Sequence, residues 1–278
     1  MEYTPQHDTE AVEPGGGHEY VRDTKSGVVH EITCRNVEFN DQDPVVVYLG
    51  LGTTALNSTG QLYLDTYADR MERPLITIDT PVRAFSSFEQ QTESQLRALR
   101  EYGVTRFDAV GASAGAIAAS HLAAHAQADV GDLVTVSMPN TRSGAMAYAR
   151  QMPAQFIDGV RESLAVLKRG EFRQVIGPSA SNLFDIRKIP ELIHTTREIF
   201  DTRFDDMPTM LAVSTHWTDI VGTGDKITNY QDHLRVIRTR NEIYPGSSTS
   251  FLVGDQGHAW VTHRLYLADI IGTVLRKK

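Results

Sequence analysis

The sequence predicts an α/β fold with a mostly parallel central sheet, flanking helices and a helical cap insertion. Short apolar runs rich in β-branched residues, such as Val45 to Leu49, alternate with longer stretches of helical character. This alternation is typical of a parallel sheet wrapped by helices. It lapses once, between about residues 140 and 205, where helical segments follow one another without a convincing strand. The 278 residues suffice for one large core with an insertion.

The N-terminal part of the chain contains a tail and a hairpin. Residues 1 to 17 are polar and include a run of three glycines, so we expect a flexible tail. Two strand-like segments, Glu19 to Arg22 and Val28 to Cys34, flank Thr24-Lys-Ser-Gly27. This arrangement favours an antiparallel hairpin.

The later elements follow from the spacing of the apolar residues. We expect strands at 45–49, 75–79, from 107 onward, 133–137, 210–214 and 249–253, and helices at about 58–70, 87–102, 225–240 and 259–275. The predicted organisation is therefore a tail at 1–17, an α/β core made of 18–139 and 206–278, and a helical cap or lid at 140–205.

The central feature is the segment from Phe107 to His121, an apolar strand that runs through Gly111-Ala-Ser-Ala-Gly115 into an alanine-rich helix. The pattern indicates a nucleophile elbow. Such a sharp turn holds a serine hydroxyl where a base can reach it and where backbone N–H groups can meet a developing oxyanion. A Cβ atom at Gly111 or Gly115 would collide with the neighbouring strand and helix. Ser113 is therefore the predicted nucleophile.

Two polar residues after later strands complete the predicted site. Asp219 follows the expected strand Met210 to Ser214, and His258 follows the expected strand Thr249 to Val253. Parallel strands bring such residues to one edge of the sheet, and serine hydrolases of α/β architecture place nucleophile, acid and base in this order. Asp225 is the alternative acid, although its position favours capping of the helix that follows.

Several segments resemble the α/β-hydrolase superfamily, over most of the predicted core. The loop after the third strand usually reads His-Gly in that family, and Leu49 stands at the place of the usual histidine. The family's Gly-x-x-Asp before the acid appears as His216-Trp-Thr-Asp219. The other matching segments are Tyr48-Leu-Gly-Leu-Gly52, Asp79-Thr-Pro81, Leu99 to Ser113 and Gly257-His258, within a match from about Val45 to Ile271.

The resemblance implies a role for each site residue. Ser113 would be the nucleophile and His258 the general base and then the acid. Asp219 would hold His258 in the correct tautomer. The backbone N–H groups of Leu51 and Ala114 would form the oxyanion hole.

The resemblance also implies the reaction. We expect a serine hydrolase that cleaves a carboxylic ester, or a related acyl bond, of a small and largely apolar substrate through an acyl-enzyme. Apolar residues of the predicted cap, such as Met146 and Phe156, favour the apolar substrate. Trp217 and Trp260 flank the predicted site as candidate substrate contacts, with a place in the core as the alternative. Thioesterase, carbon–carbon bond hydrolase, perhydrolase and acyltransferase chemistry stay open, and no metal or organic cofactor is implied.

A dinucleotide-binding oxidoreductase is the alternative from another class. Gly50-Leu-Gly-Thr-Thr-Ala55 fits the G-x-G-x-x-A fingerprint, and Asp79 ends the next strand as a ribose-binding acid would. The gap between Gly50 and Asp79 is long for that unit, and this reading leaves the three predicted catalytic residues without a role.

The composition of the chain indicates which class of partner and which compartment to expect. The formal net charge is −8, which argues against a nucleic-acid surface and leaves a small-molecule substrate as the expected partner. Cys34 is the only cysteine, as expected for a reducing, cytoplasmic compartment. The sequence contains no apolar run of 18 residues, so we expect no membrane span. It leaves the oligomeric state open.

Overall fold

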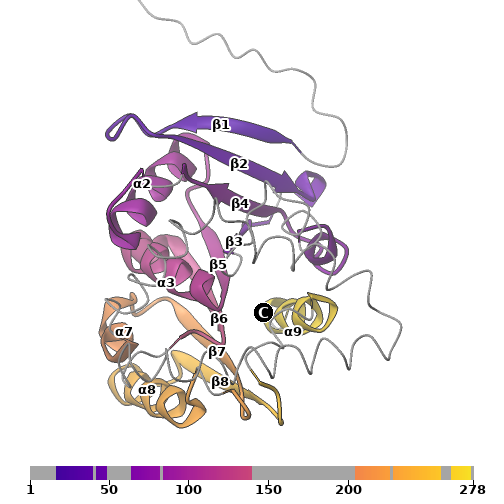
Figure 1. The fold of residues 1–278 in the computed structure, drawn as a ribbon, viewed down its shortest axis with the longest axis vertical. Coiled ribbons are helices and arrows are strands. Elements are labelled where there is room, and N and C mark those ends of the chain that lie inside the picture. Colours follow the sequence, from indigo (N-terminus) through magenta and orange to yellow (C-terminus); the bar gives the residue numbers. More distant parts are fainter. Residues whose placement is uncertain are drawn as a thin grey trace, which may run out of the picture.

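An eight-stranded sheet forms the centre of the protein in a computed structural model (Figure 1). The structure describes residues 17–39, 42–48, 64–81, 84–139, 204–225, 228–257 and 264–276. The strands are β1 (His18–Arg22), β2 (Val29–Arg35), β3 (Val45–Tyr48), β4 (Leu75–Asp79), β5 (Phe107–Ala112), β6 (Val130–Val136), β7 (His216–Gly222) and β8 (Ser248–Val253). The helices are α2 (Phe88–Glu101), α3 (Ala114–Ala126), α7 (Met207–Met210), α8 (Tyr230–Ile243) and α9 (Arg264–Arg276), with short 3₁₀ helices at Val37–Phe39, Gln127–Asp129 and Phe204–Asp206.

The strand order in the sheet is β1-β2-β4-β3-β5-β6-β7-β8. The hairpin β1–β2 is antiparallel and joins β4 in antiparallel register, whereas the pairs from β4 to β8 are parallel. The predicted hairpin and the mostly parallel sheet are thereby confirmed. Residues beyond the carboxyl ends of β3 to β8 share one edge of the sheet, where open α/β folds bind ligands.

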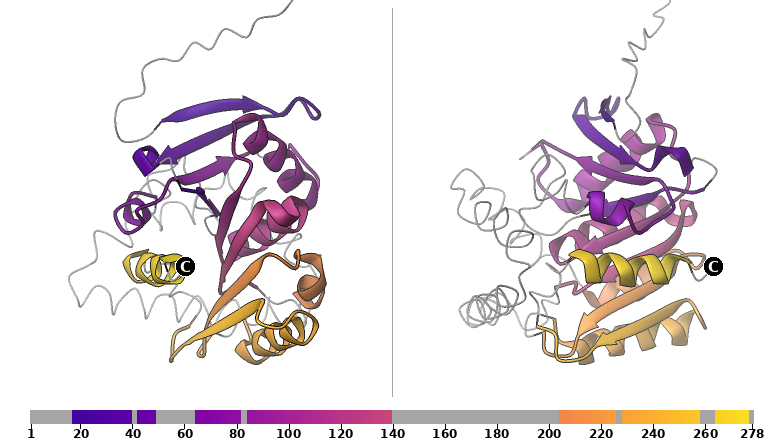
Figure 2. Two further views of the ribbon diagram at one scale, coloured as in Figure 1. Left: turned by 180° about the vertical axis from the view of Figure 1, so that it is seen from behind. Right: turned by 90° about the vertical axis from the view of Figure 1, so that its right-hand side faces the viewer.

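Helices cover both faces of the sheet (Figures 1 and 2). On one face α2, α3, α7 and α8 pack on a large apolar cluster, and on the other face α9 and the helical residues 64–68 pack on a second cluster. Strand β3 contributes to both clusters, because Val46 and Tyr48 lie in the first and Val45 and Val47 in the second. Burial on both faces explains its continuous apolar sequence.

Two sequence predictions in the second half of the sheet were wrong. Residues 210–214 do not form a strand, because Met207–Met210 is a helix with Pro208 in its first turn, and the strand is β7. The expected helix from about residue 225 begins only at Tyr230, where the Asn229 side chain accepts a hydrogen bond from the Gln231 N–H. Almost all of the predicted cap at 140–205 lies outside the described residues.

Candidate active site

The turn between β5 and α3 has the geometry of a nucleophile elbow. Ser113 joins the two elements with φ 52° and ψ −125°, a backbone conformation that side-chain-bearing residues rarely adopt. Its N–H donates to the Val136 carbonyl oxygen at 2.8 Å. A Cβ atom added to Gly111 would lie 2.4 Å from the Gly115 carbonyl oxygen and 2.5 Å from the Ala116 Cα atom. Glycine is therefore required at position 111, as the sequence predicts.

The elbow lies where the strand order reverses. Strand β3 pairs with β4 on one side and with β5 on the other, so the chain crosses from one half of the sheet to the other at this point. Tyr48, the last residue of β3, stands opposite Gly111. Such a switch point, outside the carboxyl ends of the strands, is the usual ligand site of an open α/β sheet.

Asp219 does not follow a strand, and this expectation from the sequence was wrong. It lies in the middle of β7, opposite Thr135 of β6, and its side chain is completely buried. One carboxylate oxygen accepts from the Thr135 hydroxyl at 2.7 Å, and the other lies 2.7 Å from Nδ1 of His233 on α8. Through these two contacts Asp219 connects its own strand, β7, with the neighbouring strand β6 and with helix α8.

The carboxylate of Asp219 affects the pKa of the buried His233 ring. Burial alone would lower the pKa of His233, but the charge of Asp219 and its hydrogen bond, together with the charge of Asp225, raise it. The Asp219 carboxylate therefore favours the protonated form of the His233 ring.

Asp225 occupies the position that the sequence led us to expect for Asp219. It follows β7 by three residues and is 6% exposed. Its N–H donates to the Gly222 carbonyl, and its carboxylate accepts from the Thr228 N–H at 3.0 Å. The expectation that Asp225 caps α8 was wrong, since Asn229 does so. The spacing Gly222-x-x-Asp225 is the Gly-x-x-Asp pattern of the resembled family and could have indicated this residue.

The loops after β7 and β8 are joined to each other. The Thr223 N–H donates to the Val253 carbonyl at 2.9 Å, and the Asp255 N–H donates to the Thr223 hydroxyl at 2.9 Å. A Cβ atom on Gly224 would lie only 3.2 Å from the Gln256 carbonyl oxygen. Asp225 is thereby held beside the segment that leads, two residues further on, to His258, which itself lies outside the described residues.

Of the remaining predicted site residues, the structure describes Ala114 and Trp217. Ala114 is the buried first residue of α3 and directly follows Ser113. Trp217 is fully buried, donates from Nε1 to the Thr135 hydroxyl at 2.8 Å and packs edge-on against Phe204. It is a core residue, which is the alternative that the sequence left open for it. The other predicted residues, Leu51, His258 and Trp260 with Gly50, Gly52 and Ala55 of the dinucleotide fingerprint, lie outside the described residues.

The sheet topology does not favour dinucleotide binding. In the dinucleotide-binding fold the third parallel strand extends the sheet beyond the second. Here the third parallel strand, β5, lies beside the first, β3, and the antiparallel β2 occupies the place beyond β4. Asp79 ends β4, where it pairs with Glu31 of β2.

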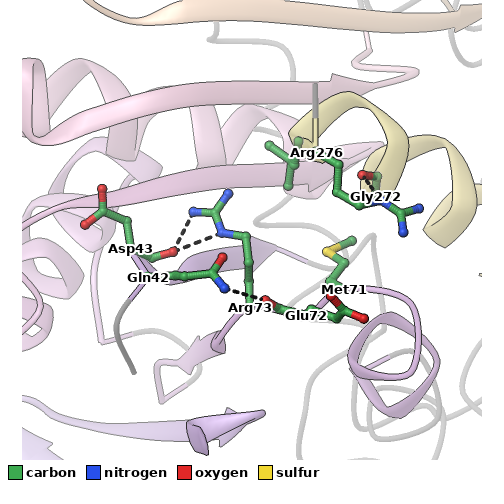
Figure 3. A pocket seen from close by; sticks show the side chains of 8 residues that line it. Gln42, Asp43, Met71, Glu72, Arg73, Gly272 and Arg276 are labelled. Atoms are coloured by element: carbon green, nitrogen blue, oxygen red, sulfur yellow. Dashed lines mark hydrogen bonds between the residues drawn. The ribbon is translucent and has the colours of Figure 1, made fainter. Parts of the chain in front are cut away.

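A pocket of about 360 Å³ is lined by residues of other parts of the chain, among them Asp43, Arg73 and Arg276 (Figure 3). Asp43 and Arg73 come just before β3 and β4, so they mark the amino-terminal edge of the sheet, and Arg276 ends α9. The guanidinium of Arg73 donates to the Asp43 carbonyl and to the Asp108 carboxylate, which occupies much of its donor capacity. Among the described residues we find no group of three potential metal ligands and no helix that is long and apolar enough to cross a membrane.

No protein-family model and no curated protein matches the sequence. A thermophilic esterase from Thermogutta terrifontis matches in structure with a TM-score of 0.63 at 15% sequence identity, over 94% of this chain and 98% of that one. An α/β hydrolase from a Medee basin deep-sea metagenome library matches with a TM-score of 0.67 at 14% identity, over 91% and 96%. A bromoperoxidase from Bacillus anthracis matches with a TM-score of 0.63 at 13% identity, over 94% and 100%.

These similarities concern the fold, because the sequence identities are low. The sheet of this chain is mostly parallel and has helices on both faces. The chain therefore has the α/β-hydrolase fold that the sequence predicts.

Proposed function

We propose that this protein is a serine hydrolase that cleaves a carboxylic ester, or a related acyl bond, through an acyl-enzyme on Ser113. The observation that carries the proposal is the backbone at Ser113, with φ 52° at the carboxyl edge of the sheet. This conformation is unfavourable for a serine. It is expected where a hydroxyl must project from a tight turn toward a base and a substrate.

In this proposal His258 takes the proton of the Ser113 hydroxyl as the oxygen attacks the acyl carbon. The N–H groups of Ala114 and Leu51 stabilise the oxyanion, and His258 then returns the proton to the leaving group. Water hydrolyses the acyl-enzyme by the same steps. Each oxyanion donor typically lowers the barrier by about 3 to 4 kcal/mol.

For the acid of the triad we propose Asp225 in place of Asp219. Asp225 lies on the loop that is bonded to the loop leading to His258. Asp219 lies inside the sheet, with hydrogen bonds to Thr135 and His233. A triad acid has to orient the imidazole of the base, and the position of Asp225 is the better suited for this.

The similar structures support a hydrolase without specifying its substrate. The esterase and the bromoperoxidase have the same fold, and one fold supports many reactions. The expectation of a small, largely apolar substrate depends on the composition of the predicted cap and stays a proposal. A panel of nitrophenyl esters of increasing acyl length, with a thioester and an amide, would identify the preferred bond and chain length.

A fluorophosphonate probe tests the nucleophile. The probe reacts covalently with an activated serine, so Ser113→Ala should abolish labelling while the circular dichroism spectrum stays unchanged. Ser120→Ala is the matched control. Ser120 lies on the same α3, donates to the Ala116 carbonyl at 2.7 Å, and its loss should leave labelling intact. Undiminished labelling of Ser113→Ala would refute the proposed function.

A further inference from the structure

A line of polar side chains runs between α2 and the sheet, from the β1–β2 turn to the end of β3. We call it the α2 relay. It consists, in order, of Asp23, Ser94, His30, Thr80, Gln95 and Tyr48. All except the half-buried Thr80 are buried. Arg97 anchors the first member, with its guanidinium nitrogens 2.9 and 2.8 Å from the two Asp23 oxygens.

The proton positions in the first half of the relay follow from Asp23. The guanidinium of Arg97 keeps the pKa of Asp23 far below its usual value, so this carboxylate can only accept hydrogen bonds. The Ser94 hydroxyl donates to it at 2.5 Å and has no second proton. The Nε2 atom of His30, 2.9 Å from the Ser94 oxygen, must therefore be the donor in that contact.

The hydrogen bond between His30 and Thr80 has the same direction. Burial lowers its pKa, an effect that the nearby Asp23 and Glu101 oppose and Arg97 reinforces. The ring is neutral at pH 7, with its proton on Nε2, and its Nδ1 atom accepts from the Thr80 hydroxyl at 3.0 Å.

The second half of the relay ends at Tyr48. The Gln95 amide nitrogen lies 2.8 Å from the Thr80 hydroxyl oxygen and 3.3 Å from the Ile78 carbonyl oxygen. Since a carbonyl only accepts, the nitrogen must face this side, and the amide oxygen faces Tyr48. The Tyr48 hydroxyl donates to it at 2.7 Å. The relay therefore contains five hydrogen bonds, and in each of them the acceptor is the residue nearer to Asp23 along the relay.

A buried polar network in which every link is made fixes one geometry of the elements that it joins. This network has its free end at the last residue of β3, directly opposite Gly111 of the elbow strand. Packing alone does not require the hydroxyl there, because a phenylalanine would fill nearly the same volume.

We propose that Tyr48 is a positioning residue for the proposed acyl transfer. Held by the α2 relay, it fixes the carboxyl end of β3 beside the elbow. It also fixes the point from which the chain continues to Leu51, three residues further along the sequence. The proposal rests on the proposed function, since Leu51 would supply an oxyanion-hole N–H group.

The test compares two tyrosines on the nitrophenyl ester that the wild type hydrolyses best. Tyr48→Phe should lower kcat about tenfold, because a slight misplacement of an oxyanion donor is costly, and should leave KM within about twofold. Tyr102→Phe is the matched control. Its hydroxyl contacts Cys34 at 3.2 Å and Glu19 at 3.4 Å, outside the relay, and its kcat should stay within about twofold of the wild type.

A second pair of variants tests whether the direction of the relay matters. His30→Gln keeps one donor and one acceptor, so it should retain most of kcat. His30→Leu keeps neither and should lower kcat as far as Tyr48→Phe. Histidine labelled with ¹⁵N should show the Nε2–H tautomer in the wild type by NMR.

The outcomes separate this proposal from the proposed function. If Ser113→Ala loses labelling while Tyr48→Phe keeps the wild-type kcat, the positioning role is refuted and the hydrolase stands. An equal loss of kcat in Tyr102→Phe would also refute it, because the effect would then be general. If Ser113→Ala is labelled normally, the proposed function fails, and the positioning role fails with it.

Discussion

Asp219 and Asp225 belong to one short segment, yet their carboxylates have different surroundings. Asp219 is enclosed between β6, β7 and α8 and shares its two oxygens between Thr135 and His233. Asp225 lies beyond the end of β7, on a loop held against the loop after β8. Removal of the two charges should therefore have different consequences.

Asparagine substitutions make the difference measurable. Asp225→Asn should lower kcat by about 10³ to 10⁴, because an amide does not hold the catalytic imidazole in its active tautomer. Asp219→Asn should instead cost about 3 kcal/mol or more of the free energy of unfolding, since it breaks the buried pair and leaves the His233 ring without its carboxylate partner. Urea denaturation and kcat per folded molecule, measured on both variants, check the two expectations.

The opposite pattern would reassign the acid. A wild-type kcat in Asp225→Asn, together with a stable but inactive Asp219→Asn, would mean that Asp219 serves the base as first predicted from the sequence. Ser137→Ala changes a buried residue directly after β6. It shows how much kcat and the free energy of unfolding fall when any buried polar side chain at the carboxyl edge of the sheet is removed.

At the scale of elements, the His233–Asp219 pair ties α8 to β7, and it makes their association depend on pH. The pKa of His233 is raised in the folded protein, where Asp219 and Asp225 outweigh the effect of burial. A raised pKa means that the folded state binds the proton more tightly than the unfolded state. The resulting stabilisation is complete below the unfolded pKa, near 6.5, and is lost as the pH rises through the folded pKa.

Denaturation at several pH values tests this link. Above about pH 6.5 the free energy of unfolding of the wild type should fall with a slope of at most about 1.4 kcal/mol per pH unit from this group. The double variant Asp219→Asn/His233→Gln lacks the titrating pair and should not show this slope. His18→Gln, a change at the exposed His18 of β1, is the control and should keep this slope. An equal slope in the double variant would contradict the assignment.

The elements that the sequence predicts correctly are those whose apolar pattern matches their burial. Strand β3 is a continuous apolar run, and in β4 only Thr77 interrupts the buried apolar residues. Ser87 caps α2 by accepting from the Gln90 N–H. Strand β7 was missed because its interior carries Thr218 and Asp219 between apolar residues. The Asp219 carboxylate is tolerated there because β6 and α8 provide its partners, which no local pattern indicates.

The same distinction explains the candidate site. Ser113 is predictable because the glycine at 111, the serine and the alanine-rich helix are contiguous in the sequence. The sequence placed the acid directly after a strand expected at 210–214, and the structure has the strand at β7 instead. Asp219 therefore lies inside β7, and Asp225 is the acid that we propose in its place. The same expected strand placed Trp217 near the site, whereas its burial follows from β7 lying between two other strands.

At the scale of the whole molecule, the proposed site is assembled from segments that are distant in sequence. Ser113 follows β5, and the joined loops that hold Asp225 and lead toward His258 follow β7 and β8. The α2 relay adds residues of the N-terminal hairpin and of α2 on the other side of the elbow. The parallel register from β5 to β8 brings these parts to one edge of the sheet.

Because the loops after β7 and β8 are hydrogen-bonded to each other, we expect ester hydrolysis to recover late during folding. These hydrogen bonds require β7 and β8 to be paired first, and parallel pairings between distant segments form slowly because long stretches of chain must be closed. After dilution from urea, far-ultraviolet circular dichroism should recover before ester hydrolysis does. Thr223→Val removes the hydroxyl that accepts from the Asp255 N–H and should lengthen this delay. Simultaneous recovery of both signals would mean that the edge of the sheet with the proposed site forms together with the helices.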